Sequence, residues 1–154
     1  MKFPTVTPRA QLLLAASAVL IVIANAAVHP TIERHKPLLP VSDAPPSVLA
    51  TLQRACQDCH SQNTAWPWYS AIPPISWQIH SDVEHGRQFM DFSKWSTYSD
   101  AQKRGLLISM NTALQTHAMP PSKYLLLHPN ARLSATDQQA LQGWAKAAQQ
   151  RLRK

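Results

Sequence analysis

The residues best suited to chemistry are the two cysteines of the chain and the histidine that follows them. Cys56 and Cys59 are separated by Gln57 and Asp58, and His60 comes next. This C-x-x-C-H order is typical of c-type haem attachment. Two thiols one helical turn apart can each form a thioether with a haem vinyl group, and the next residue then directs its imidazole at the iron. The pattern therefore predicts one covalent haem c.

Three other uses of the cysteine pair compete with haem. A thioredoxin-like dithiol needs a preceding strand and a βαβ context, which the sequence does not show. A zinc site could recruit His80 and His85, but twenty residues separate Cys59 from His80 and the role of His60 would be unexplained. A plain disulfide is the third alternative. Haem is favoured because it alone uses both thiols and the adjacent imidazole.

The sixth iron ligand is predicted to be Met119. It lies 59 residues after His60, which leaves enough chain to pass through two helices and return, and Pro120 and Pro121 stiffen the backbone that follows it. Methionine opposite histidine raises the reduction potential, which suits an electron carrier. The competing candidates for this ligand are Met90, Met110, His80, His85 and His117. His117 is the strongest of them, since it is only two residues from Met119. An open sixth position is the remaining alternative.

The elements that must position these residues are all expected to be helices. One helix, capped by Ser47 and with Val48, Leu52 and Ala55 on one face, should run into Cys56. A proline-rich loop covers residues 66–74, and a helix over about 77–90 carries Ile79, Val83 and Met90. Ser99 should cap a helix with Leu107, Met110 and Leu114 on its apolar face. Ser134 should cap the last one, with Asp137 as its capping-box partner and an apolar face of Leu141, Trp144, Ala148 and Leu152.

The N-terminal region has the features of an export signal. Lys2 and Arg9 precede an apolar run from Leu12 to Ala24, and Ala24-Asn25-Ala26 is a cleavage-like site. Residues 1–28 are thus expected to form a signal peptide or a membrane anchor, with anchoring through residues 10–28. Residues 29–46, which contain five prolines, are expected to be a linker, and residues 47–154 the domain. We expect the protein in the periplasm, exported or held at the inner membrane.

Charge gives a weaker indication of partners. The net charge is +7, but the basic residues are scattered and follow no nucleic-acid-binding motif, so no nucleic acid is expected as a partner. The expected partners are redox proteins in the periplasm or the inner membrane.

The region from residue 56 to 134 resembles the bacterial haem-binding domain family, a cytochrome c-like group. The matching pieces are Cys56-x-x-Cys59-His60-Ser61, Trp66-Pro67-Trp68-Tyr69-Ser70, Ser76-Trp77, Asp82-Val83-x-x-Gly86-Arg87, Phe92-Ser93-x-Trp95, Met119-Pro120-Pro121-x-x-Tyr124, His128-Pro129 and Leu133-Ser134. The resemblance implies an all-α, cytochrome c-like domain around one covalent haem, and periplasmic export. It names no reaction. It also suggests that the carbonyl of Ile72 or Pro73 accepts a hydrogen bond from His60.

Other candidate haem contacts are aromatic or cationic. Trp66, Trp68 and Tyr69 carry N–H or O–H groups that could bond the haem propionates, although packing around the haem would also explain them and Trp77. Arg87 is the best cationic partner for a propionate, with a plain surface arginine as the alternative.

Three functions remain open on the sequence alone. The first is a one-electron carrier with two protein ligands on the iron, which is not an enzyme. The second is a haem sensor or haem enzyme with an open sixth position. The third is a small accessory module of a larger redox complex. The sequence contains no paired carboxylates, nucleophile triad or phosphate loop that would support other catalysis.

Overall fold

The computed structural model describes residues 7–26, 41 and 44–153, and in these residues the chain is helical with no strand. Helix α1 (Pro8–Ala26) comes first. The domain that follows contains α2 (Pro46–Ala55), α3 (Gln57–His60), α4 (Ile75–Phe89), α5 (Asp100–Gln115), α6 (Ser122–Leu125) and α7 (Ala135–Arg151). Three short 3-10 helices are interspersed: η1 (Trp68–Ala71), η2 (Phe92–Thr97) and η3 (Pro129–Ala131). The all-α prediction is confirmed.

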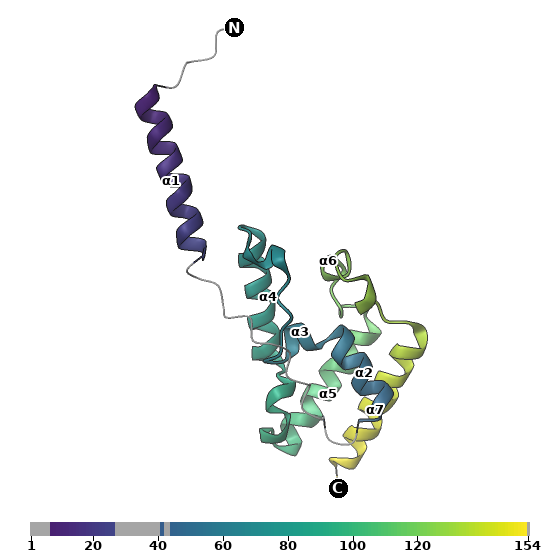
Figure 1. Cartoon of the computed structure of the whole chain (residues 1–154). Helices are drawn as coiled ribbons and strands as arrows, with labels where there is room; N and C mark the ends of the chain where they lie inside the picture. Colours follow the sequence, from purple (N-terminus) through teal and green to yellow (C-terminus); the bar gives the residue numbers. More distant parts are fainter. Residues whose placement is uncertain (1–6, 27–40, 42–43, 154) are drawn as a thin grey trace.

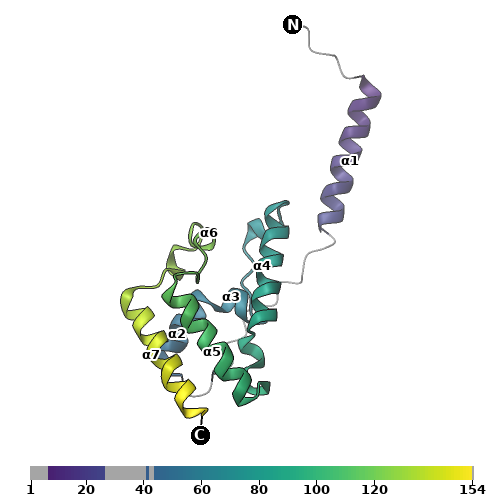
Figure 2. The same ribbon diagram turned by 180° about the vertical axis from the view of Figure 1, so that it is seen from behind.

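The two longest helices of the domain, α5 and α7, lie side by side, and α2 packs across α7 (Figures 1 and 2). Their apolar faces form one core with residues from η2. Its largest fully buried side chains are Phe92, Leu52, Leu107 and Leu141. The short α3 leaves the end of α2 and packs against α4, so the C-x-x-C-H segment lies between this core and α4. The core thus fixes the direction in which α2 delivers the attachment segment.

Helix starts follow local capping signals closely, with one exception. Ser99 and Ser134 each cap a helix in a capping box, with Gln102 and Asp137 as the respective partners. Ser47 does not cap α2, contrary to prediction. The helix begins one residue earlier at Pro46, because proline at the first helical position lacks the N–H that would need a cap.

The middle of the domain also departs from prediction in detail. The proline-rich loop contains the 3-10 helix η1, and α4 begins two residues before the predicted start. Met90 lies just beyond the end of α4, in extended backbone, and its side chain is buried in the core. This position frees the Met90 carbonyl from the helix, which matters for His60 below.

The N-terminal predictions are only partly covered by the described residues. Helix α1 contains the whole of the predicted apolar run from Leu12 to Ala24, and several of its large apolar side chains, such as Leu12 and Leu20, are exposed. None of the described helices is both long enough and apolar enough to cross a membrane. Most of the predicted linker lies outside the described residues. Val41, which was assigned to that linker, is buried in the domain core.

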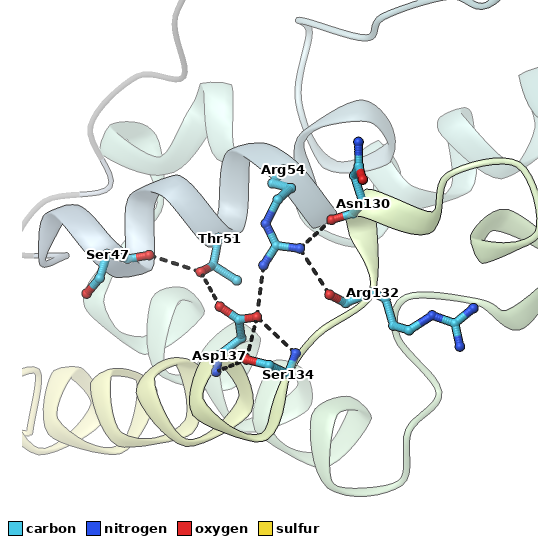
Figure 3. Close-up of polar contacts among 7 residues, drawn as sticks. All are labelled: Ser47, Thr51, Arg54, Asn130, Arg132, Ser134 and Asp137. Atoms are coloured by element: carbon cyan, nitrogen blue, oxygen red, sulfur yellow. Dashed lines mark hydrogen bonds and ion pairs between the residues drawn. The ribbon is translucent and has the colours of Figure 1, made fainter.

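A polar cluster joins α2 to the start of α7 directly before the cysteines (Figure 3). Arg54 donates to the carbonyls of Asn130 and Arg132 and forms an ion pair of 2.9 Å with Asp137. Thr51 donates to the other carboxylate oxygen of Asp137 at 3.1 Å. Because Arg54 is two residues before Cys56, this cluster fixes the end of α2 from which the attachment segment leaves.

Replacing Asp137 by asparagine is expected to destabilise the fold at neutral pH but not in acid. Hydrogen bonds from the backbone and side chain of Ser134, with smaller contributions from Thr51 and Arg54, lower the pKa of Asp137 to about 2. A carboxylate whose folded pKa lies below its unfolded value of about 3.9 stabilises the fold above about pH 4, and this contribution disappears as the pH falls through 2. The expected cost at pH 7 is about 1 kcal/mol, since the carboxylate is partly exposed.

Chemical denaturation at pH 7 and at pH 2 measures this difference. The matched control is Asp100→Asn, which changes the other aspartate found in the first turn of a long helix. The control should alter the free energy of unfolding by less than about 0.5 kcal/mol. An equal loss of folding stability in both variants would contradict the assigned role of Asp137. So would a loss of stability in Asp137→Asn that persists at pH 2.

Candidate haem site

An apolar cleft of about 220 Å³ lies beside the attachment segment. Asp58 and Cys59 of α3 contribute one part of its wall, and Ile79 and Val83 of α4 another. The remaining wall comes from η1 and from the segment around α6, chiefly Tyr69, Pro121, Tyr124, Leu127 and His128. An apolar cleft with polar groups at a few points is the usual form of a cofactor site.

The two cysteines are free thiols in different surroundings. Cys59 is on the cleft wall, whereas Cys56 packs against the hydrophobic core. Desolvation raises the pKa of Cys56 to about 12 and that of Cys59 to about 11, with neighbouring negative charge as a smaller cause in both. Both thiols are therefore protonated at neutral pH, unlike the reactive thiolate of a dithiol oxidoreductase.

His60 is buried and held in one tautomer. Its Nδ1 is 3.0 Å from the carbonyl oxygen of Met90, which can only accept, so Nδ1 carries the proton. Burial lowers the pKa of His60, which keeps the ring neutral. Because Nδ1 makes the hydrogen bond to Met90, Nε2 is the ring nitrogen that could bind a metal.

The partner of His60 differs from the sequence prediction. The Ile72 carbonyl, which was one of two predicted acceptors, accepts instead from the Ser76 N–H at 2.8 Å. Met90 takes the role because α4 ends at Phe89, and the extended backbone at Met90 turns its carbonyl out of the helix. A buried carbonyl with no helical partner is a ready acceptor for the imidazole.

The attachment segment is pressed closely against α4. A Cβ atom built on Gly86 would lie 2.4 Å from the Cys59 carbonyl oxygen, far inside van der Waals contact. One residue on, Arg87 donates to the Ser61 carbonyl and to the Thr64 hydroxyl, each at 2.8 Å. Glycine and arginine together fix α3 and the loop after it onto α4.

The comparison with family models matches residues 15–147 to the haem-binding domain model. The chain belongs to the haem-binding domain family. This membership supports a haem cofactor and confirms the resemblance seen in the sequence. Searches of curated proteins and of solved structures return no match to the chain.

In this haem-binding domain, Met119 lies beyond the end of α5 with 43% of its surface exposed. It does not line the cleft, but Pro121, two residues later, does. The competing ligands are engaged elsewhere. Met90 and Met110 are buried in the core, His80 stacks on Trp66, His85 is near Ser81, and His117 is near Gln138 on α7.

The aromatic candidates divide into two groups. Trp68 and Trp77 are 80% and 66% exposed and do not pack into the protein core. Trp66 is half-buried, with its ring 4.6 Å from that of His80. Tyr69 lines the cleft and bonds His128 through its hydroxyl at 3.1 Å. Of the predicted haem contacts other than the iron ligands and the cysteines, Tyr69 alone lines this cleft, and Arg87 is committed to the loop after α3.

The donor set fits a c-type haem better than its rivals. Two free thiols precede a histidine whose Nδ1 is held by a backbone carbonyl, with Nε2 as the nitrogen that would meet the iron. The part of the chain that the structure describes holds no group of three or more His, Cys, Asp or Glu side chains placed to bind a metal ion. His80 and His85 have the partners given above.

Two residues of the site were not assigned a role from the sequence. Asp58 lies within the C-x-x-C motif, where its identity carries no signal, and its carboxylate accepts from the Tyr124 hydroxyl at 2.9 Å. Tyr124 belongs to the Met-Pro-Pro-x-x-Tyr part of the resemblance, but the resemblance gave no contact for its side chain. The general need of a buried tyrosine hydroxyl for a hydrogen-bonding partner was the one feature that could have indicated a polar contact at Tyr124.

Proposed function

We propose that this chain is a c-type haem protein that carries single electrons. Cys56 and Cys59 would hold one covalent haem, His60 would bind the iron through Nε2, and Met119 would supply the sixth ligand. The bound haem would supply the one-electron redox change. The protein's own residues would exclude water, fix the imidazole and hold the cofactor against the apolar cleft.

The observation that carries this proposal is the state of His60. It is buried, its pKa is lowered by that burial, and its Nδ1–H donates to the Met90 carbonyl, which leaves Nε2 as the nitrogen for the iron. This is how a protein prepares an imidazole for iron, because the bonded nitrogen fixes the ring orientation and raises the basicity of the other. The two thiols immediately before it are free to form the thioethers.

Met119 is favoured as sixth ligand because Met90 and Met110 are buried in the core, His80 stacks on Trp66, and the rings of His85 and His117 contact Ser81 and Gln138. Two ligands from the protein suit electron transfer, since the iron then keeps its coordination in both oxidation states. An open sixth position would instead suit a sensor or an enzyme.

We also propose that the protein is exported and works with redox partner proteins in the periplasm or the inner membrane. The basic residues Lys2 and Arg9 flank an apolar stretch, and α1 exposes much of that stretch. Such a surface is ordinarily covered by lipid or protein, or removed by cleavage.

The carrier role is tested by the spectrum and carbon monoxide binding of Met119→Ala. The wild type is expected to show the weak long-wavelength band of ferric iron–thioether ligation and to bind carbon monoxide slowly, because Met119 must leave first. The variant should lose the band and bind carbon monoxide rapidly. Met110→Leu, a near-isosteric change at a core methionine, is the control and should keep the band. Rapid carbon monoxide binding by the wild type would contradict the carrier role.

A further inference from the structure

The segment that follows Met119 is held almost entirely by polar contacts. No residue of α6 is buried, and Leu126 and Leu127 just after it are 81% and 62% exposed. Apolar burial therefore contributes little to holding this segment over the cleft. The hydrogen bonds and the ion pair of its side chains are thus important for its position.

The central contact joins α6 to the attachment motif itself. The Tyr124 hydroxyl donates to one carboxylate oxygen of Asp58 at 2.9 Å. The other oxygen of Asp58 accepts from the Ala65 N–H at 2.9 Å, so the carboxylate is held on both sides. Burial, with the charge of Asp58 as a further cause, raises the pKa of Tyr124, and the hydroxyl thus remains a donor.

A second chain of contacts supports the first. The Tyr124 ring stacks on His128 at 4.0 Å, and the Tyr124 carbonyl is 3.0 Å from Nδ1 of His128. Because a carbonyl only accepts, Nδ1 carries the proton and Nε2 accepts from the Tyr69 hydroxyl at 3.1 Å. The four side chains Asp58, Tyr124, His128 and Tyr69 all line the cleft, and they join α3, α6 and η1 across it.

The ion pair of this segment is weaker. Lys123 lies 2.8 Å from Asp82 of α4, but both side chains are more than a third exposed. Exposed pairs of this kind contribute little. The hydrogen bond between Tyr124 and Asp58, which is half-buried and charge-assisted, is the stronger connection.

We propose that Asp58 and Tyr124 form a latch that holds the Met119 segment over the cleft. Only four residues lie between Met119 and Tyr124, and Pro120 and Pro121 among them stiffen the connection. Fixing Tyr124 therefore limits how far Met119 can move. Asp58 and Tyr124 are positioning residues: they act on the iron through Met119, and this inference rests on the proposed role of Met119 as a ligand.

The test is Tyr124→Phe in the full-length protein, which removes one hydroxyl and keeps the ring stacked on His128. The matched control is Tyr98→Phe. Tyr98 is also half-buried, and its hydroxyl oxygen accepts from the Asp91 N–H, at a site that does not involve α6. Two readouts are compared: amide hydrogen exchange over residues 119–128, and the rate of carbon monoxide association with the reduced protein.

Loss of one charge-assisted hydrogen bond in Tyr124→Phe should accelerate the exchange over residues 119–128 and the carbon monoxide association by about tenfold each. Tyr98→Phe is the control for exchange alone and should leave the exchange over residues 119–128 nearly unchanged, because its partner, the Asp91 N–H, belongs to the peptide group whose carbonyl holds His60. Unchanged exchange in Tyr124→Phe would overturn the latch. Faster exchange with unchanged carbon monoxide association would overturn its action on the iron. Failure of the proposed function can be told apart from failure of the latch, because the wild-type spectrum alone would reveal a lack of haem or of the iron–thioether band.

Discussion

Replacing both Cys56 and Cys59 by alanine is expected to abolish covalent haem completely. In the proposed attachment, each thiol would add across a haem vinyl group, with the sulfur bonding one carbon and the hydrogen going to the other. These two are the only cysteines of the chain, so no other residue can take over the attachment. Without covalent bonds, only the proposed His60 ligand and the apolar cleft would retain a haem.

Haem staining after denaturing electrophoresis and the intact mass of the purified protein measure the attachment. The single variants are graded controls, since each leaves one thiol and is expected to give one thioether at reduced yield. Cys56→Ala should also cost about 1 kcal/mol of folding stability, because Cys56 packs against the core. Covalent haem in the double variant would rule out the assignment of these cysteines.

Gly86→Ala is expected to destabilise the fold although it leaves the proposed haem-binding residues intact. The added methyl carbon would lie 2.4 Å from the oxygen and 3.0 Å from the carbon of the Cys59 carbonyl group. Both atoms are backbone, so relief requires that α3 move away from α4. Such overpacking costs about 1–3 kcal/mol or more, which exceeds the gain of about 1 kcal/mol from replacing a glycine within a helix.

The chain provides close controls for this prediction. Gly105 in α5 and Gly143 in α7 are also helical glycines, and a Cβ built on either meets nothing within 4 Å. Gly105→Ala and Gly143→Ala should raise the free energy of unfolding by up to about 1 kcal/mol. Chemical denaturation of the three variants, together with their yield of covalent haem, measures the difference. A Gly86→Ala protein as stable as the controls would show that α3 and α4 are not in such close contact.

The features that could be predicted from the sequence are those encoded within one or two helical turns. The caps at Ser99 and Ser134 need only residues three positions apart, and both are found as predicted. The apolar faces of α2, α5 and α7 likewise follow from helical spacing, and their predicted members are buried or packed against the core. The C-x-x-C-H motif is local too, and it led directly to a haem-binding family.

The features that could not be predicted depend on residues far apart in the chain. Met90 is 30 positions from His60, and its carbonyl is available only because α4 ends one residue before it. Asp58 and Tyr124 are 66 positions apart. Val41 lies in a proline-rich stretch typical of a linker, yet it is buried in the core. Each of these contacts is decided by how the helices pack, which periodicity and capping do not encode.

The two cysteines face different parts of the fold. Cys56 packs against the core that α2 forms with α5 and α7, whereas Cys59 lies on the wall of the cleft. With the proposed covalent attachment, one thioether would tie the haem to the core and the other would tie it to the cleft between α3 and α4. A change that loosens either part of the fold would then also loosen the hold on the cofactor.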